Sequence, residues 1–506
     1  MGTRYDVVIV GSGIGGLVCA ELLGREGLSV CVLEKNVQTG GSLQIFSRDK
    51  AIIDTGVHYI GGCAPGQNLY KVFKYLGLMD ELRLERYPED AFDKIVIDGE
   101  DREYAFAQGY DRFIASLAKD FPGEEGAIQR YCDLIRDVCT KFPMYGIRYS
   151  DSDGGKSEVM HMDAQQTIAG FTENEKLRAV LAGNNLLYAG RAGTPFYIHA
   201  VILNSYIESS WKCVGGGNRI ARILVHRIRE RGGVVKTRAE VTRFVEQDGR
   251  IDHVVLSTGE TVLGDRFVSA IHPARTLEMV EGETLRPAFR NRIASLPNTT
   301  GCFSLYIVFH PDSFPYIPYN YYVHKPGHLW NMMDHDDADW PRGHAIFFSK
   351  QEGEGAYAST MTVLAYMRQE EVSAWADSHN TTAHPSSRPA DYEAFKERKA
   401  EILIHLMEKR FPGIRDHIRS WHAATPLTYR DYIGDPDGSM YGLERDHRRT
   451  IQARIASRTR VPNLFLTGQN LNVHGILGTT ISALVTVREM TGDDDLIDRI
   501  RHVEDE

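Results

Sequence analysis

The sequence predicts an α/β protein in which a Rossmann-type domain is interleaved with an α+β domain. Three observations lead to this prediction. A βαβ pattern opens the chain, a second helix-and-strand pattern returns after residue 215, and 506 residues exceed what one compact core of ordinary size holds. The composition is that of a globular protein, with 42% hydrophobic and 25% charged residues.

The first βαβ unit runs from Tyr5 to Glu34. A β-branched run ends at a glycine-rich turn, an apolar helical segment follows, and a second β-branched run ends at Glu34. Gly11 allows the tight turn, Gly13 lets the backbone approach a pyrophosphate, and Gly16 lets the helix pack on the strand. An acid at position 34 can accept hydrogen bonds from a ribose and disfavours a 2′-phosphate, which leaves FAD or NAD as the dinucleotide.

Further glycine pairs follow this unit, at Gly40-Gly41 before Ser42 and at Gly61-Gly62. A long FAD laid through a protein needs such crossings more than a nicotinamide cofactor does. From residue 66 to about 203 the pattern reads as largely helical, because apolar residues recur at helical spacing.

A second informative block opens at Gly215-Gly216-Gly217. An amphipathic helical pattern ends at Gly232-Gly233, and two short β runs follow at 234–236 and 240–242. Turns at Gly249 and Gly259 then lead to another β run at 267–270. The block is therefore predicted to return to the sheet that the first unit begins.

The remaining third of the chain alternates strands and helices. Strands are predicted at 303–309, 345–348 and 361–364, and a helix at 392–411. The aromatic stretch 314–322 either lines an apolar tunnel, rests on a membrane surface or packs as ordinary hairpin aromatics. The predicted division is 1–107, 205–300 and 456–506 for the dinucleotide domain, with 108–204 and 301–455 forming the helical and the sheet-and-helix parts of the substrate domain.

Four motifs suggest a family. They are Gly56-Val57-His58-Tyr59-Ile60-Gly61, Ala423–Tyr429, Gly438–Gly442, and the strand-and-turn run 463–470 with Gly468-Gln469. With them the chain resembles the phytoene-desaturase-related group of the flavin amine-oxidase superfamily, and within that group the retinol saturase branch. The resemblance implies an FAD-binding domain of the glutathione-reductase/amine-oxidase kind, with Val241 contacting the adenine through its backbone.

The residues expected to bind FAD combine the glycine turns with the C-terminal strand-and-turn motif and the final helix, which is predicted to begin at Gly478-Thr479. The N-terminus of such a helix carries partial positive charge that would favour reduced flavin. The full set is Gly11, Gly13, Ile14, Gly15, Gly16, Glu34, Lys35, Gly40, Gly41, Ser42, Val241, Gly468, Gln469, Gly475, Gly478 and Thr479.

The resemblance implies an FAD-dependent oxidoreductase that acts on C=C bonds of a lipophilic polyene, retinoid- or carotenoid-like, by saturation. Reduced flavin would deliver a hydride to one carbon and an acid would protonate its neighbour. The candidate acids are His58, Tyr59, Tyr441 and His474, because each adjoins a glycine motif. Desaturation, redox-neutral cis–trans isomerisation, amine oxidation and non-enzymatic polyene carriage stay open as alternatives.

The turn at Gly468-Gln469 departs from the superfamily, whose members carry an acid at the second position. A neutral amide removes one negative charge from the surroundings of the cofactor. We therefore expect anionic reduced flavin to form more easily, which favours transfer of the hydride towards the substrate.

Bulk properties exclude several classes. The net charge of −10 disfavours nucleic acid as a partner, and no close cluster of histidines and carboxylates predicts a metal site. Seven scattered cysteines favour a reducing cytoplasm, and no apolar run reaches the roughly 18 residues of a membrane span, which leaves peripheral membrane contact open. The electron donor, the exact substrate and the oligomeric state do not follow from the sequence.

Overall fold

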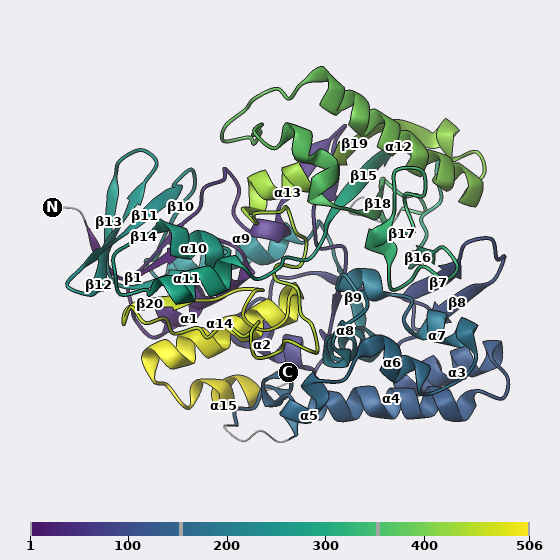
Figure 1. Ribbon diagram of the computed structural model, residues 1–506, viewed down its shortest axis with the longest axis horizontal. Helices are drawn as coiled ribbons and strands as arrows, with labels where there is room; N and C mark the ends of the chain where they lie inside the picture. The colour runs from purple at the N-terminus through teal and green to yellow at the C-terminus, as the bar shows by residue number, and fades with distance from the viewer. Residues whose placement is uncertain (1–2, 151–154, 351–354, 504–506) are drawn as a thin grey trace.

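The computed structural model describes residues 3–150, 155–350 and 355–503. Its two large sheets lie side by side along the longest axis, each flanked by its own helices (Figure 1). The first sheet draws its strands from three separate stretches of chain, and the second sheet is inserted between them. The predicted fold class is thereby confirmed.

The first sheet is built around β1, which pairs in parallel with β2 on one side and β13 on the other. Parallel strands β10 and β20 extend it, while β11 and β12 add an antiparallel meander next to β13. The strands are β1 (Arg4–Val10), β2 (Val30–Leu33), β10 (Val234–Lys236), β11 (Val241–Gln247), β12 (Arg250–Leu256), β13 (Thr261–Ser269), β14 (Val280–Glu281) and β20 (Leu464–Leu466).

Alternation along β1 places residues in two different cores. Val7 and Ile9 pack with the helices on one face, and Val8 and Val10 pack with the meander on the other. Both faces are covered, so the strand is apolar throughout, as is usual for a parallel sheet. The helices of this domain are α1 (Ile14–Arg25), α2 (Asn68–Tyr75), α9 (Asn218–Glu230), α10 (Pro273–Met279), α11 (Pro287–Ala294), α14 (Gly475–Thr491) and α15 (Leu496–Arg501).

The second sheet has seven strands in the order β19-β15-β18-β17-β16-β7-β8, antiparallel except for the β16–β7 pair. The long helix α12 (Ala390–Arg410) covers one face, and helices from the middle of the chain cover the other (Figure 1). The strands are β7 (Asp93–Ile97), β8 (Glu103–Phe106), β15 (Gly301–Phe309), β16 (Asn320–His324), β17 (Gly343–Ser349), β18 (Thr360–Met367) and β19 (Ile418–Ala424).

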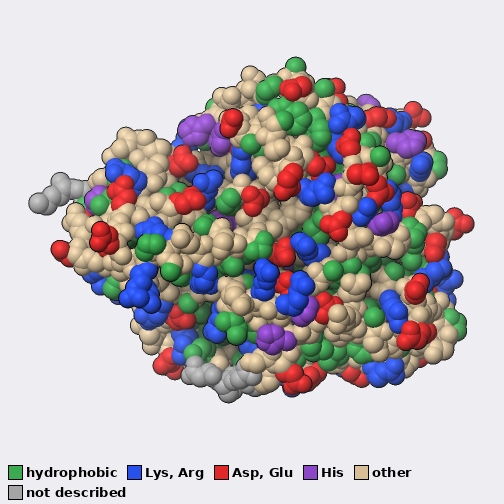
Figure 2. Space-filling model, viewed as in Figure 1, with side chains coloured by type: hydrophobic (Ala, Val, Ile, Leu, Met, Phe, Trp, Pro, Cys, Tyr) green, Lys and Arg blue, Asp and Glu red, His purple; other side chains and the backbone are tan. Residues whose placement is uncertain are grey.

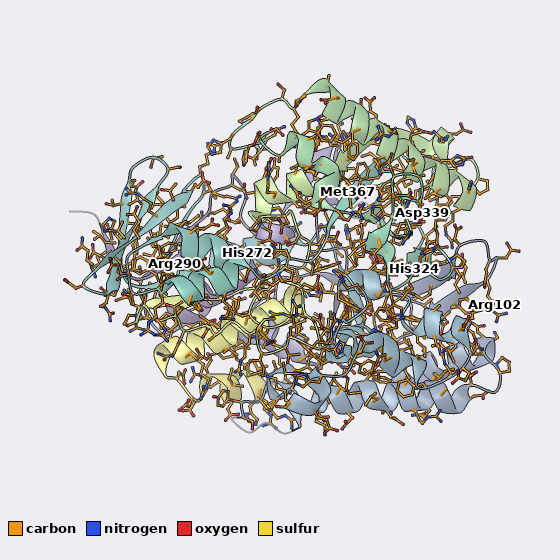
Figure 3. All side chains as sticks on the ribbon, viewed as in Figure 1. Arg102, His272, Arg290, His324, Asp339 and Met367 are labelled. Carbon is orange, nitrogen blue, oxygen red and sulfur yellow. The ribbon has the colours of Figure 1, made fainter. Side chains whose placement is uncertain are left out.

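The remaining elements include the helical layer over the second sheet and two small sheets. His324 at the end of β16 hydrogen-bonds with the carbonyl of Gly183 after α7 and so joins the sheet to the helical layer (Figure 3). The helices are α3 (Tyr110–Asp120), α4 (Glu125–Thr140), α5 (Lys156–Met160), α6 (Ala164–Ala169), α7 (Glu175–Leu181), α8 (Phe196–Glu208) and α13 (Pro426–Ile433), and the short strands are β3 (Ile45–Arg48), β4 (Ala51–Asp54), β5 (Ile60–Gly61), β6 (Leu84–Arg86) and β9 (Ser210–Cys213).

The expected helical pattern from residue 66 to 203 needs correction, because β6, β7 and β8 interrupt it. Strands β7 and β8 also lie within 1–107, the segment expected to belong to the dinucleotide domain, yet they pair into the second sheet. The partner of β7 is β16, more than 200 residues later in the chain. Pairing at that separation leaves no local trace in the sequence.

The surface mixes charges of both signs. On the face shown in Figure 2, lysines and arginines alternate with aspartates and glutamates over both domains. Among the described residues, no helix is both long enough and apolar enough to cross a membrane.

The close contact between α1 and the first glycine turn gives a stability prediction. A Cβ on Gly16 would lie 2.1 Å from the carbonyl oxygen of Gly11, so Gly16→Ala must push the helix off the strand. We expect a loss of about 1–3 kcal/mol in the free energy of unfolding, measured by denaturant titration.

The matched control is Gly24→Ala in the same helix. There the new methyl would meet only the Arg231 side chain, at 3.4 Å. This variant is expected to gain up to about 1 kcal/mol from helix propensity. Equal effects at the two positions would contradict the packing argument.

Candidate active site

A channel of about 510 Å³ runs along the carboxyl ends of the first sheet. Ligands of open parallel sheets bind at this edge. Of the sixteen residues expected to hold a dinucleotide, fourteen line the channel. The other two are Gly16, which serves the packing of α1, and Gly478, which lines a neighbouring cavity.

The glycine turns leave room for a pyrophosphate. A Cβ added to Gly13 would meet no protein atom within 4 Å, because it would point into open space. Gly41 approaches the same turn so closely that its Cβ would lie 3.1 Å from the Gly13 Cα. The N-terminus of α1 therefore faces the channel, and the residues present fit a dinucleotide.

Glu34 is buried, with 5% of its surface exposed, and its carboxylate organises the turn itself. One oxygen accepts hydrogen bonds from the Ser12 backbone N–H at 3.1 Å and from its hydroxyl at 2.5 Å. The other oxygen accepts from the Asn36 N–H at 2.8 Å. Each carboxylate oxygen can accept more than one hydrogen bond, so a ribose can still be bound.

At the other end of the channel, a carboxyl group stands beside Gln469. The Gln469 amide donates to Asp435 at 3.3 Å, and the Ser439 hydroxyl donates to the same oxygen at 2.9 Å. Burial raises the pKa of Asp435. The loop after α13 therefore brings a carboxyl to this turn from 34 residues upstream, which was not foreseen from the sequence. The direction of hydride transfer expected from the neutral amide stays a prediction, because burial of Asp435 disfavours a negative charge on its carboxyl.

Several residues from the loops around α10 and α13 complete the channel. Lys35 donates from its ammonium to the Asp431 carbonyl at 2.7 Å, and burial lowers the pKa of Lys35. His272, at the start of α10, also lines the channel (Figure 3). These loops could not be assigned to the channel from the sequence, because only the folded chain brings them to the glycine turns.

A second cavity of about 590 Å³ lies beside the channel and faces the second sheet. Such a volume suits an organic ligand of moderate size. Most of its wall is aromatic or aliphatic, which favours a lipophilic ligand. Its apolar lining includes Leu69, Phe142, Met144, Leu186, Val201, Ile202, Phe347, Leu364, Ile481 and Val485, with tyrosines at 59, 145, 197, 206, 322 and 441.

The two spaces share a wall of six residues: Gly56, Val57, Met440, Tyr441, Gly475 and Ile476. Two of them, Gly475 and Ile476, are the first residues of α14, which begins three residues earlier than predicted. The first N–H groups of a helix have no partners within it and carry partial positive charge. The shared wall is thus the place where a cofactor and a lipophilic ligand can meet.

All four candidate acids line the second cavity, so the structure brings them together. The two histidines are neutral at physiological pH, because burial lowers the pKa of His58 to about 3 and that of His474 to about 4. His474 donates from Nε2 to the Leu187 carbonyl at 2.9 Å. His58 stacks on Phe347, and its Nε2 is buried with no partner among the described residues.

The tyrosines differ in what their hydroxyls do. Tyr441 donates to the Leu186 carbonyl at 2.8 Å and packs against His474. Tyr59 donates to Asp93 at 2.8 Å and lies 2.7 Å from the Tyr322 hydroxyl. Asp93 was missed from the sequence, although an acid opening an apolar strand is a usable signal.

The aromatic stretch 314–322 contributes one residue, Tyr322, to the cavity wall. Phe314, Tyr316, Tyr319 and Tyr321 pack in the core on the opposite face of the second sheet. Of the three predicted alternatives for this stretch, most of its aromatic residues therefore fit packed hairpin aromatics. Among the described residues, no group of three or more His, Cys, Asp or Glu is placed to hold a metal ion.

This fold, in which a dinucleotide channel opens onto a second cavity, is shared with solved structures of oxidoreductases. Residues 9–76 match the family described as NAD(P)-binding Rossmann-like domain. Two solved structures share the architecture at 14% identity and a TM-score of 0.62. One is an oxidoreductase from Methanosarcina mazei, and the match covers 94% of this chain and 98% of that protein. The other is a putrescine oxidase bound to putrescine, and the match covers 97% of this chain and 99% of that protein.

In sequence, the chain is similar to the all-trans-retinol 13,14-reductases. It is 27% identical to that of Danio rerio and 26% identical to that of Homo sapiens, over 95% of this chain and 84–85% of theirs. Prolycopene isomerase 1 of an Oncidium hybrid cultivar is 22% identical over 97% of this chain and 84% of its own. The resemblance inferred from the motifs is thereby confirmed.

The open space at Gly13 gives the first prediction on the site. Gly13 has φ −60°, so Gly13→Leu strains no backbone, and its side chain would fill the place of the pyrophosphate. We expect a folded protein that purifies without its dinucleotide, checked by absorption spectrum and by thermal unfolding. Stoichiometric cofactor in the folded variant would contradict the assignment of this turn.

The geometry around Glu34 gives a second prediction. Glu34→Ala removes acceptors for Ser12 and Asn36 together with a ribose contact. Dinucleotide binding should weaken by about 1–3 kcal/mol, measured by fluorescence after dialysis. Glu34→Gln keeps the shape without the charge and should lose less. A dissociation constant unchanged in Glu34→Ala would make the carboxylate purely structural.

Proposed function

We propose that this protein is an FAD-dependent oxidoreductase that saturates a C=C bond of a lipophilic polyene. One observation carries the proposal: the apolar cavity and the dinucleotide channel share the wall formed by residues 56–57, 440–441 and 475–476. The names of the relatives support the choice of substrate class and of reduction, because they act on all-trans-retinol and on prolycopene.

FAD is the proposed dinucleotide. The channel extends from Glu34, where an adenosine ribose would lie, to Gln469 and Thr479 beside the second cavity. An acid at the end of β2 favours a dinucleotide without a 2′-phosphate. The first turn of α14 would stabilise negative charge on the reduced ring system.

When bound and reduced, flavin supplies a hydride to one alkene carbon. The chain's own residues hold the polyene in the apolar cavity, exclude water and supply a proton to the neighbouring carbon. The neutral state of His58 and His474 makes a tyrosine hydroxyl the better proton source. His58 Nε2 offers a hydrogen-bonding partner to a polar end of the substrate.

Amine oxidation is the weaker candidate, although a putrescine oxidase shares the fold. A site for an ammonium group needs acceptors that compensate its charge on burial. Among the described residues, the cavity wall contains two cationic side chains, Lys156 and Arg454, and one carboxylate, Glu489. That balance of charge does not favour a cation.

We also place the protein in the cytoplasm, with peripheral membrane contact to collect a lipophilic substrate. The support for a reducing compartment is that all seven cysteines are free and buried.

The test starts from the protein as purified. The bound flavin is photoreduced without oxygen, candidate retinoids and carotenoids are added, and both the flavin spectrum and the product mass are recorded. We expect reoxidation of one flavin per polyene and a product heavier by two hydrogen atoms. Gly13→Leu, which lacks the cofactor, is the matched control and should give no product.

Each other outcome points to a different function. A product of unchanged mass and altered geometry would indicate isomerisation. Reduction of oxidised flavin by the polyene would indicate desaturation. A coloured protein with bound polyene and no flavin would replace the enzyme with a carrier.

A further inference from the structure

Three side chains from distant parts of the chain form a hydrogen-bonded row that ends in the second cavity. Asp93 opens β7, Tyr59 precedes β5 and Tyr322 lies in the middle of β16. The Tyr59 hydroxyl lies 2.8 Å from Asp93 Oδ2 and 2.7 Å from the Tyr322 hydroxyl. Both tyrosines are lining residues of the cavity, with 5% of Tyr59 and 0% of Tyr322 exposed, whereas Asp93, also 0% exposed, is not among the lining residues.

The far side of Asp93 is held by Asn320. The Asn320 amide donates to Asp93 Oδ1 at 2.9 Å, and the Tyr87 hydroxyl donates to the Asn320 side-chain oxygen at 3.3 Å. The carboxyl oxygens therefore have different roles: Oδ1 accepts from Asn320, and Oδ2 faces the tyrosines.

The groups around Asp93 are mostly neutral. Tyr59, Tyr322 and Asn320 surround its carboxyl, and Tyr87 and Tyr206 lie near enough to interact with it electrostatically. Burial raises the pKa of Asp93 to about 7, an effect that the hydrogen bonds from Asn320 and Tyr59 only partly offset. The carboxyl can therefore change its protonation state near physiological pH.

Each tyrosine has only one proton, so the state of Asp93 determines the direction of the whole row. With Asp93 ionised, Tyr59 donates to the carboxylate and Tyr322 donates to Tyr59, so neither proton points into the cavity. With Asp93 protonated, the carboxyl donates to Tyr59 and Tyr59 donates to Tyr322. The Tyr322 proton is then not used within the row and is available to a ligand in the cavity that Tyr322 lines.

We propose that Tyr322 is the proton donor to the polyene. Asp93, acting through Tyr59, orients the hydrogen bonds so that the Tyr322 proton is available, and it replaces that proton after transfer. This inference rests on the proposed saturase function. It also reassigns Tyr59, one of the four acids expected from the sequence, from donor to relay.

The step balances with the reduced flavin as the source of the electron pair. The alkene takes a hydride at one carbon and the Tyr322 proton at its neighbour, giving a C–C single bond and oxidised flavin. The Tyr59 proton moves to Tyr322, and the Asp93 proton moves to Tyr59. Asp93 is left ionised and takes its next proton from water between turnovers.

The test is a pH profile of polyene reduction in a single turnover of the photoreduced protein. The wild type should react fast below pH 7 and lose rate about tenfold per pH unit above it, as Asp93 ionises. Tyr322→Phe removes the donor and should slow the reaction roughly 10²–10⁴-fold at every pH.

Asp93→Asn tests the pH dependence itself. If Asp93 were only structural, its replacement would leave the shape of the pH profile unchanged. Asn320 should hold the new amide oxygen in place, which turns the amide N–H towards Tyr59. The hydrogen bonds then run from residue 93 to Tyr59 and from Tyr59 to Tyr322, as they do when Asp93 is protonated. A first turnover independent of pH around 7 is expected, followed by slow later turnovers because the amide cannot resupply a proton. An unchanged pH profile in Asp93→Asn would overturn the proposal.

Tyr104→Phe is the matched control. It removes the hydroxyl of a buried tyrosine on β8, next to β7, at a position outside the cavity wall and outside the row. It should keep the wild-type pH profile. The same change in profile for this control as for Asp93→Asn would also overturn the proposal.

A measurement without substrate separates the failure of this proposal from failure of the proposed function. Infrared difference spectra of the resting protein between pH 5 and pH 9 should show a protonated carboxyl band that disappears with a midpoint near 7 and is absent in Asp93→Asn. If that band is found but no polyene is reduced, the saturase function fails. If polyenes are reduced and the band is missing, the role of Asp93 fails.

Discussion

The path of residues 56–61 is the constraint on which both sites depend. This segment begins in the wall shared by the channel and the cavity, and two residues later it carries His58 and Tyr59 into the cavity. Close backbone contacts hold it at both ends. A Cβ on Gly56 would meet the Ser42 carbonyl at 3.0 Å, and one on Gly61 would meet the Ser205 backbone at 2.6 Å. Glycine is required at Gly61 because α8 approaches too closely for any side chain.

Position along this segment also explains the division of chemistry. Gly56 and Val57, at its start, line the dinucleotide channel, where backbone must come near a cofactor. Its aromatic end lies against β16 and β17 of the other domain, where Phe347 stacks on His58 and Tyr322 contacts Tyr59. Burial against these apolar neighbours keeps His58 neutral and the tyrosines protonated. The cavity is thereby suited to an uncharged ligand.

Charge at the cofactor end is controlled by the fold rather than by one motif. Gln469 stands where relatives of the superfamily were expected to carry an acid, yet Asp435 brings a carboxyl to the same place. The two residues lie on different loops and meet only because α13 and the end of β20 approach the channel together. A single motif position therefore says little about the net charge around a cofactor.

Local pattern determined much of this protein by itself. The βαβ unit, its glycine turn, Glu34 and the return at Gly215 all follow from short-range periodicity and from steric demands of single residues, so fourteen of the sixteen expected cofactor residues could be placed on one channel. Tertiary structure alone decided that β7 joins β16, that Asp93 meets Tyr59 and Tyr322, and that Asp435 meets Gln469. These contacts join residues far apart in the chain, and the burial that raises the pKa of Asp93 exists only after the second sheet has packed against the segment that carries Tyr59. The sequence names the side chains, but their distances and their protonation depend on the packed interior.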